Sequence, residues 1–154
     1  MAPDNTIPMT SIPLTESQRR HQKVMYHVVM AMQDTPYILK EGTALLLTRG
    51  LPRHSLDLDF DSGKKVNIGK RIQHAMASSG AEILNLTLAK NTDTVQRFKV
   101  HYRDNSAGIT NMLKIESSFR TNPPDDLVEI VNGIRTYTIQ AMIEQKIAAV
   151  ENRT

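Results

Sequence analysis

A first amphipathic helix is predicted over residues 15–34, because apolar side chains recur there at intervals of three and four residues. Thr15 or Ser17 can cap its first turn through a side-chain hydroxyl. The apolar positions are Val24, Met25, Val28, Val29 and Met32. We expect this face of the helix to pack against a hydrophobic core.

The segment Leu-Asp-Leu-Asp-Phe, which begins at Leu56, alternates apolar and acidic residues. A period of two is typical of a half-buried strand, whose successive side chains point to opposite faces. Leu56, Leu58 and Phe60 are therefore expected on the core side. Asp57 and Asp59 share the other face.

The rest of the pattern mixes short helices with strands, and turn residues separate them. It indicates an α+β protein, a mixed β-sheet with flanking helices. Further strands are expected at residues 37–40, 82–88, 95–102, 111–119, 128–131 and 134–138, and further helices at 42–48, 64–79 and 139–152.

The length of 154 residues, 40% of them hydrophobic, fits one compact domain. Residues 1–14 contain three prolines among polar residues and are expected to form a flexible N-terminal arm, so the domain spans 15–154. A net charge of +3 permits a nucleic-acid partner without requiring one. Because the chain has no Cys, no signal peptide and no apolar run long enough for a membrane span, we expect a cytoplasmic protein without a membrane partner.

Asp57 and Asp59 lie about 6 to 7 Å apart along one strand face, close enough to share hard cations through oxygen ligands. Alternating acids also occur on solvated strand faces, so this spacing alone leaves the function open. Gly42-Thr43 adds context, because it precedes a helix whose N-terminus can hold phosphate oxygens. Glu116, on a later strand, is the candidate third carboxylate for a two-metal site.

Two motifs make a family resemblance specific. Residues 38–45 read Ile-Leu-Lys-Glu-Gly-Thr-Ala-Leu, and residues 53–60 read Arg-His-Ser-Leu-Asp-Leu-Asp-Phe. Together they resemble the nucleotidyltransferase toxins of the abortive-infection type IV toxin–antitoxin systems, which carry Lys-Gly-Gly-Thr-Ala-Leu and then Arg-x-Ser-x-Asp-x-Asp-Phe. The segment Lys-Ile-Glu at residues 114–116 and the segment Ile-Glu-Gln-Lys-Ile-Ala-Ala at residues 143–149 are also similar to that family.

The resemblance implies a minimal nucleotidyltransferase fold of the polymerase-beta-like kind, which moves a nucleoside monophosphate from a nucleoside triphosphate (NTP) to an acceptor. It implies Mg²⁺, with Mn²⁺ as a substitute, an RNA (tRNA-like) or protein acceptor, and a cognate antitoxin. It also implies roles for eight residues. Asp57, Asp59 and Glu116 would be catalytic metal ligands, Lys146 would contact the triphosphate, Gly42 and Thr43 would hold phosphate, and Arg53 and Ser55 would brace the site.

Two departures from the family pattern keep alternatives open. Glu41 stands where the family usually has a second Gly, and the chain stops at Thr154, where relatives continue into a helical region. A degenerate, non-catalytic nucleotide-binding member of the fold is one alternative. A glycosyltransferase with a metal-binding Asp-x-Asp is another.

Overall fold

The computed structural model describes residues 15–40, 43–44, 47, 57–105 and 108–151. Seven strands form one sheet in the order β3-β4-β5-β2-β1-β7-β6. Its members are β1 (Ile38–Leu39), β2 (Asp57–Asp61), β3 (Ala81–Asn91), β4 (Val95–Asp104), β5 (Ile109–Ser118), β6 (Val128–Val131) and β7 (Ile134–Tyr137). The helices are α1 (Glu16–Met30), α3 (Gly69–Ser78), α4 (Ile139–Glu151) and the short 3-10 turn η2 (Asp125–Leu127).

The sheet is mixed, as the sequence predicts. β2 runs parallel to β5 and antiparallel to β1, and β1 runs parallel to β7. The hairpin between β6 and β7 turns on Asn132 and Gly133, whose φ angles of 53° and 83° are those that a tight hairpin turn requires. The α+β class, a mixed sheet with flanking helices, is thereby confirmed.

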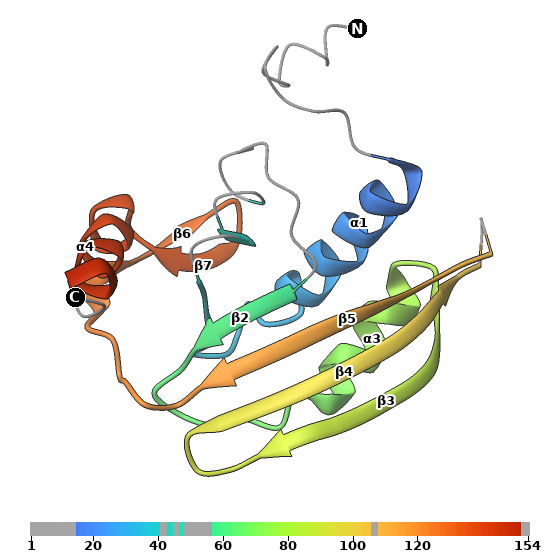
Figure 1. Cartoon of the computed structure of the whole chain (residues 1–154), viewed down its shortest axis with the longest axis horizontal. Helices are drawn as coiled ribbons and strands as arrows, with labels where there is room; N and C mark the ends of the chain where they lie inside the picture. The colour runs from blue at the N-terminus through green and yellow to red at the C-terminus, as the bar shows by residue number, and fades with distance from the viewer. Residues whose placement is uncertain (1–14, 41–42, 45–46, 48–56, 106–107, 152–154) are drawn as a thin grey trace, which may run out of the picture.

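Two helices cover one face of the strands β2 to β5 (Figure 1). α1 and α3 lie behind this part of the sheet, where the alternate buried residues of each strand meet them. Of the described elements, none lies over the opposite face, which we call the open face. α4 lies instead beside β6 and β7, at the other end of the sheet (Figure 1).

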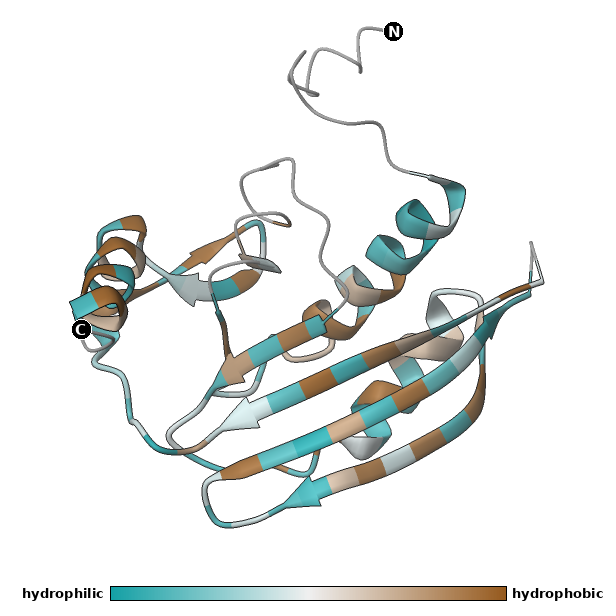
Figure 2. Cartoon of the chain, viewed as in Figure 1, coloured by the Kyte–Doolittle hydropathy of each residue, from teal (hydrophilic) through white to brown (hydrophobic). Residues whose placement is uncertain are grey.

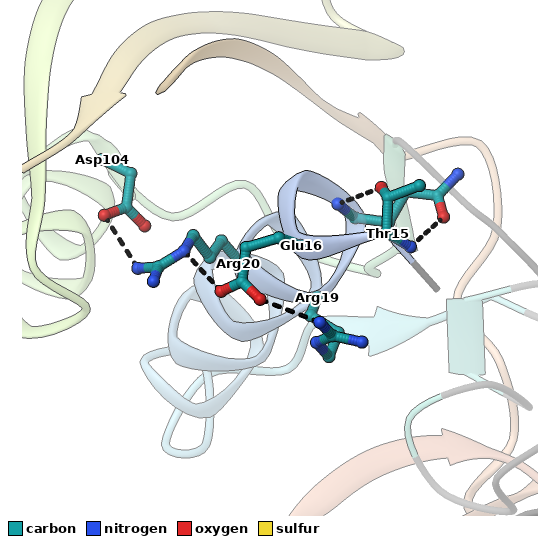
Figure 3. Close-up of polar contacts among 6 residues, drawn as sticks. Thr15, Glu16, Arg19, Arg20 and Asp104 are labelled. Atoms are coloured by element: carbon teal, nitrogen blue, oxygen red, sulfur yellow. Dashed lines mark hydrogen bonds and ion pairs between the residues drawn. The ribbon is translucent and has the colours of Figure 1, made fainter. Parts of the chain in front are cut away.

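Polar contacts fix the start of α1 (Figure 3). Thr15 caps the helix as predicted, because its hydroxyl accepts a hydrogen bond from the backbone N–H of Gln18 at 3.1 Å. One turn on, Arg20 forms ion pairs with Glu16 at 2.8 Å and with Asp104 of β4 at 3.2 Å. These contacts tie α1 to the strand that it covers.

The predicted helix over residues 64–79 begins too early, since α3 starts only at Gly69. The preceding segment is held as a loop by Tyr37. The hydroxyl of Tyr37 accepts a hydrogen bond from the N–H of Val66 and donates one to the carbonyl of Val66, at 3.2 and 3.1 Å. Asn67 then accepts a bond from the N–H of Gly69 at 3.2 Å. Sequence periodicity does not reveal such distant contacts.

Candidate active site

Three carboxylates lie together on the open face of two neighbouring strands. In β2, Leu58 and Phe60 are buried in the core, so Asp57 and Asp59 lie on the open face, as the alternation predicts. In β5, Glu116 lies on the same face. The parallel register pairs Asp59 with Glu116, and paired positions on adjacent strands stand about 4.8 Å apart.

Cations accompany these acids on the open face. The Nε of Arg97, on β4, contacts a carboxylate oxygen of Glu116 at 2.6 Å. The Nζ of Lys114 lies 3.6 Å from a carboxylate oxygen of Asp57, its register partner on β2. Glu116 and Asp57 therefore each have a cationic neighbour on the open face.

Asp59 is the acid whose ionised form is least favoured by its surroundings. Burial raises the pKa of this carboxyl above its ordinary value, and the negative charge of Glu116 raises it further. Lys114 and Lys40 act in the opposite direction without cancelling the shift. A cation beside Asp59 would favour its ionised form.

Hard carboxylate oxygens are the donors that Mg²⁺ prefers, so the chemistry of Asp57, Asp59 and Glu116 fits such an ion. In the part of the chain that the structure describes, however, no three His, Cys, Asp or Glu side chains stand close enough to hold a metal as they are. The residue types fit a divalent cation, and in this structure one carboxylate oxygen of Glu116 is already engaged by Arg97.

A third β2 aspartate, Asp61, has a structural role that the sequence analysis missed. The hydroxyl of Tyr137 donates a hydrogen bond of 2.5 Å to its carboxylate, and the Nζ of Lys40 lies 3.6 Å away. Burial and this contact raise the pKa of Tyr137. The spacing Asp57-x-Asp59-x-Asp61 places Asp61 on the same face, which was a readable signal, but its partners could not be read from the sequence.

A cleft of about 590 Å³ opens next to this aspartate. Lys40 and Asp61 contribute to its wall from the sheet, and Lys146 and Gln145 contribute from α4. The backbone N–H of Lys40 donates to the carbonyl of Asp59 at 2.8 Å, so the cleft adjoins the acids. Lys146, selected from the sequence, therefore belongs to a cavity with a second lysine beside the carboxylates.

The other residues selected from the sequence are only partly described. The hydroxyl of Thr43 is buried and donates a hydrogen bond of 2.8 Å to the backbone carbonyl of Asp57, which ties a helical turn to β2. Gly42, Arg53 and Ser55 lie outside the described residues. Arg97 was not predicted from the sequence, because only the pairing of β4 with β5 places it beside Glu116.

None of the helices in the described part of the chain is both long and apolar enough to cross a membrane.

Comparisons with known proteins identify a matching family and similar folds. A family model described as the nucleotidyl transferase AbiEii toxin of type IV toxin–antitoxin systems matches residues 23–154. No match is found among curated protein sequences.

Two solved structures from Helicobacter pylori are similar, each at 36% sequence identity. The protein JHP933 superposes with a TM-score of 0.81 over 88% of this chain and 58% of its own. A candidate nucleotidyltransferase superposes with a TM-score of 0.80 over 87% of this chain and 59% of its own. The chain thus spans less than two thirds of the length of either solved protein.

Proposed function

Because the chain belongs to the AbiEii family of nucleotidyltransferase toxins, we propose that it is a metal-dependent nucleotidyltransferase acting as a toxin or phage-defence protein. It would move a nucleoside monophosphate from an NTP to an RNA or protein acceptor. The observation that carries the proposal is the register of β2 and β5, which sets Asp59 against Glu116 with Asp57 on the same face. A nucleotidyltransferase fold around this constellation favours nucleotidyl transfer over the Asp-x-Asp glycosyltransferase alternative.

Asp57, Asp59 and Glu116 would hold Mg²⁺, or Mn²⁺ in its place. When bound, such an ion supplies charge neutralisation on the transferring phosphoryl group and lowers the pKa of a coordinated hydroxyl. Arg97 holds Glu116 on the open face through their 2.6 Å contact. Lys114 does the same for Asp57 at 3.6 Å.

The triphosphate would occupy the cleft beside the acids. Lys40 and Lys146 both line it, and two ammonium groups can counter the charge of β- and γ-phosphates. The N-terminus of the helical turn at Thr43 would add backbone N–H donors, with Gly42 allowing close approach. The hydroxyl of Thr43 keeps that turn against Asp57.

Family membership also leads us to propose a cognate antitoxin as a partner and the cytoplasm as the location of the protein. The antitoxin would limit the activity of the toxin.

The proposal is tested by incubating the protein with each of the four α-³²P-labelled ribonucleoside triphosphates, Mg²⁺ and total RNA. We expect label to appear in RNA, or in a protein band, with one NTP preferred. Asp57→Asn should reduce transfer on the order of 100-fold or more, because it removes a metal ligand that acts in the transition state. EDTA should abolish transfer.

Asp93→Asn is the matched control, since Asp93 is exposed in the turn between β3 and β4 and lies outside the site. It should transfer label like the wild type. Equal activity of wild type and Asp57→Asn would refute the site. Mg²⁺-dependent NTP binding without any transfer would favour the non-catalytic nucleotide-binding alternative.

A further inference from the structure

The open face of the sheet continues from the acids into two rows of cations. One row runs across the strands from Asp59 through Glu116 and Arg97, and the next runs parallel to it from Asp57 through Lys114. Register places Lys90 of β3 at the far end of the first row and Lys99 of β4 beyond Lys114 in the second. Neighbouring backbone positions in this grid are about 4.8 Å apart across strands and about 6.8 Å apart along them.

Along β4 the open face is basic over four consecutive alternate positions. They are Arg97, Lys99, His101 and Arg103, while the intervening Phe98, Val100 and Tyr102 are buried in the core. In Figure 2 the alternation appears as hydrophilic and hydrophobic bands along β4, with α1 and α3 on the far side. We call the exposed Lys90 of β3, together with the half-buried Lys99 and the exposed His101 of β4, the β4 ladder.

The two arginines at the ends of this basic row are paired within the protein, and, in the part of the chain that the structure describes, the lysine between them is not. Arg97 is paired with Glu116, and Arg103 lies 3.5 Å from Glu82. Among the described residues, no carboxylate forms an ion pair with Lys99 or Lys90. Lys99 moreover stands directly opposite Lys114, and like charges in such cross-strand positions destabilise a sheet. The Nζ of Lys114 also lies 3.6 Å from Asp57, so Lys99 is the member of this pair to which an anion can bind without displacing a carboxylate.

We propose that the β4 ladder binds the phosphate backbone of an RNA acceptor and directs its reacting end to Asp59 and Glu116. The inference rests on the proposed function, which it deepens by choosing RNA over a protein acceptor. A regular grid of cations suits the repeating charge of a nucleic-acid backbone. Protein interfaces are commonly anchored by aromatic residues or Arg. The open face of β4 presents no Phe, Tyr or Trp side chain from Arg97 to Arg103, and both arginines are engaged in ion pairs within the protein.

The composition of the face also defines the mode of recognition. No Phe, Tyr or Trp lies on the open face of β4 or β5, so bases have no aromatic side chain on which to stack there. Recognition through phosphates alone tolerates any base and weakens steeply with salt. The ladder would thus bind the acceptor RNA without specificity for its base sequence.

The test measures binding of a fluorescein-labelled single-stranded RNA of mixed sequence, about 12 nucleotides long, by fluorescence anisotropy. EDTA is present and NTP is omitted, so neither the metal nor the transfer reaction contributes. The ladder variant carries Lys90→Gln and Lys99→Gln. Each lost phosphate contact should lower the slope of log affinity against log salt by about 0.7, which is about a fivefold loss of affinity near 0.1 M salt.

The matched control carries Lys23→Gln and Lys70→Gln, which remove two exposed lysines from α1 and α3 on the other side of the sheet. It should bind RNA like the wild type. Equal loss in both double variants, or no loss in the ladder variant, would overturn the proposal. So would a glutamate-rich peptide that binds to the ladder in place of RNA.

The two proposals can fail separately. If the ladder variant loses RNA affinity while the wild type transfers no label, the proposed RNA-binding surface is supported and the proposed nucleotidyl transfer is refuted. If the wild type transfers label and the ladder variant binds RNA normally, the transfer stands and the acceptor surface falls.

Discussion

Asp59 is a carboxylate whose neighbours favour its neutral form. Burial and the charge of Glu116 raise the pKa of Asp59, so the ionised side chain costs the folded state free energy that the unfolded chain does not bear. Catalytic sites commonly hold such charges for the benefit of a ligand. The same residue can therefore reduce stability and serve function.

Asp59→Asn should raise the melting temperature in EDTA near neutral pH, because the amide removes the repulsion from Glu116. A raised carboxyl pKa means that the cost is present when the group is ionised and absent when it is protonated. The gain should therefore shrink as the pH falls through the pKa of Asp59. Differential scanning calorimetry across the acidic and neutral range measures this.

Adding Mg²⁺ should reverse the order of the melting temperatures of the wild type and Asp59→Asn. A ligand that binds only the folded state stabilises it by mass action, and the variant lacks one of the proposed ligands. The melting temperature of the wild type should rise with Mg²⁺ more than that of Asp59→Asn. An equal rise in both proteins would remove Asp59 from the proposed metal site.

At the scale of elements, the sequence predicts those features of the fold that depend on the local pattern of apolar, polar and turn residues. The alternation around Leu58 correctly indicated the faces of β2, and the strands predicted at residues 128–131 and 134–138 correspond to β6 and β7. The predicted start of α3 was wrong, because the hydroxyl of Tyr37, which is distant in sequence, holds the preceding segment as a loop. The helix propensity of a segment can therefore be overridden by a hydrogen bond from a residue far away in the sequence.

The candidate site divides in the same way. Asp57 and Asp59 were selected from their spacing, Glu116 from its place on a later strand, and Lys146 from the family resemblance. Arg97 and the β4 ladder could not be found, because their positions depend on which strands pair and in which register. Cross-strand register is a property of the folded sheet, and no short motif in this chain encodes it.

α4 is an element with little burial. It buries Ala141 and Met142, while Ile143 and Ile147 are each 54% exposed. Replacing both isoleucines by Gln should change the free energy of unfolding by no more than about 0.5 kcal/mol per site, as at other surface positions. Met142→Ala should cost about 2 to 5 kcal/mol, because it leaves a cavity. Urea unfolding followed by circular dichroism compares the variants, and a large loss in the isoleucine variant would show that these side chains are covered.

At the scale of the whole molecule, β1 lies between two parts of the sheet that differ in how far helices cover them. On one side, α1 and α3 cover the long strands β3, β4, β5 and β2 (Figure 1). On the other side, β6, β7 and α4 join the rest through the short parallel pairing of β1 with β7 and through hydrogen bonds that include the one from Tyr137 to Asp61. Buried side chains such as Ile134 and Met142 add to this connection. The triphosphate cleft has walls from both parts, so its shape depends on this connection.

Tyr137→Phe removes a hydrogen bond that crosses between the two parts. Asp61 would be left buried with Lys40 as its remaining partner, at a cost of about 1 to 3 kcal/mol. Because the bond anchors β7, we expect amide hydrogen exchange to accelerate in β6, β7 and α4 by about tenfold, where local opening governs exchange. Amides of β4 and β5, which exchange through larger openings, should be less affected. Tyr26→Phe, at an exposed tyrosine of α1, is the control and should leave every rate unchanged. A uniform acceleration throughout the sheet would instead mean that the two parts unfold as one cooperative unit, and the cleft would then be as rigid as the core.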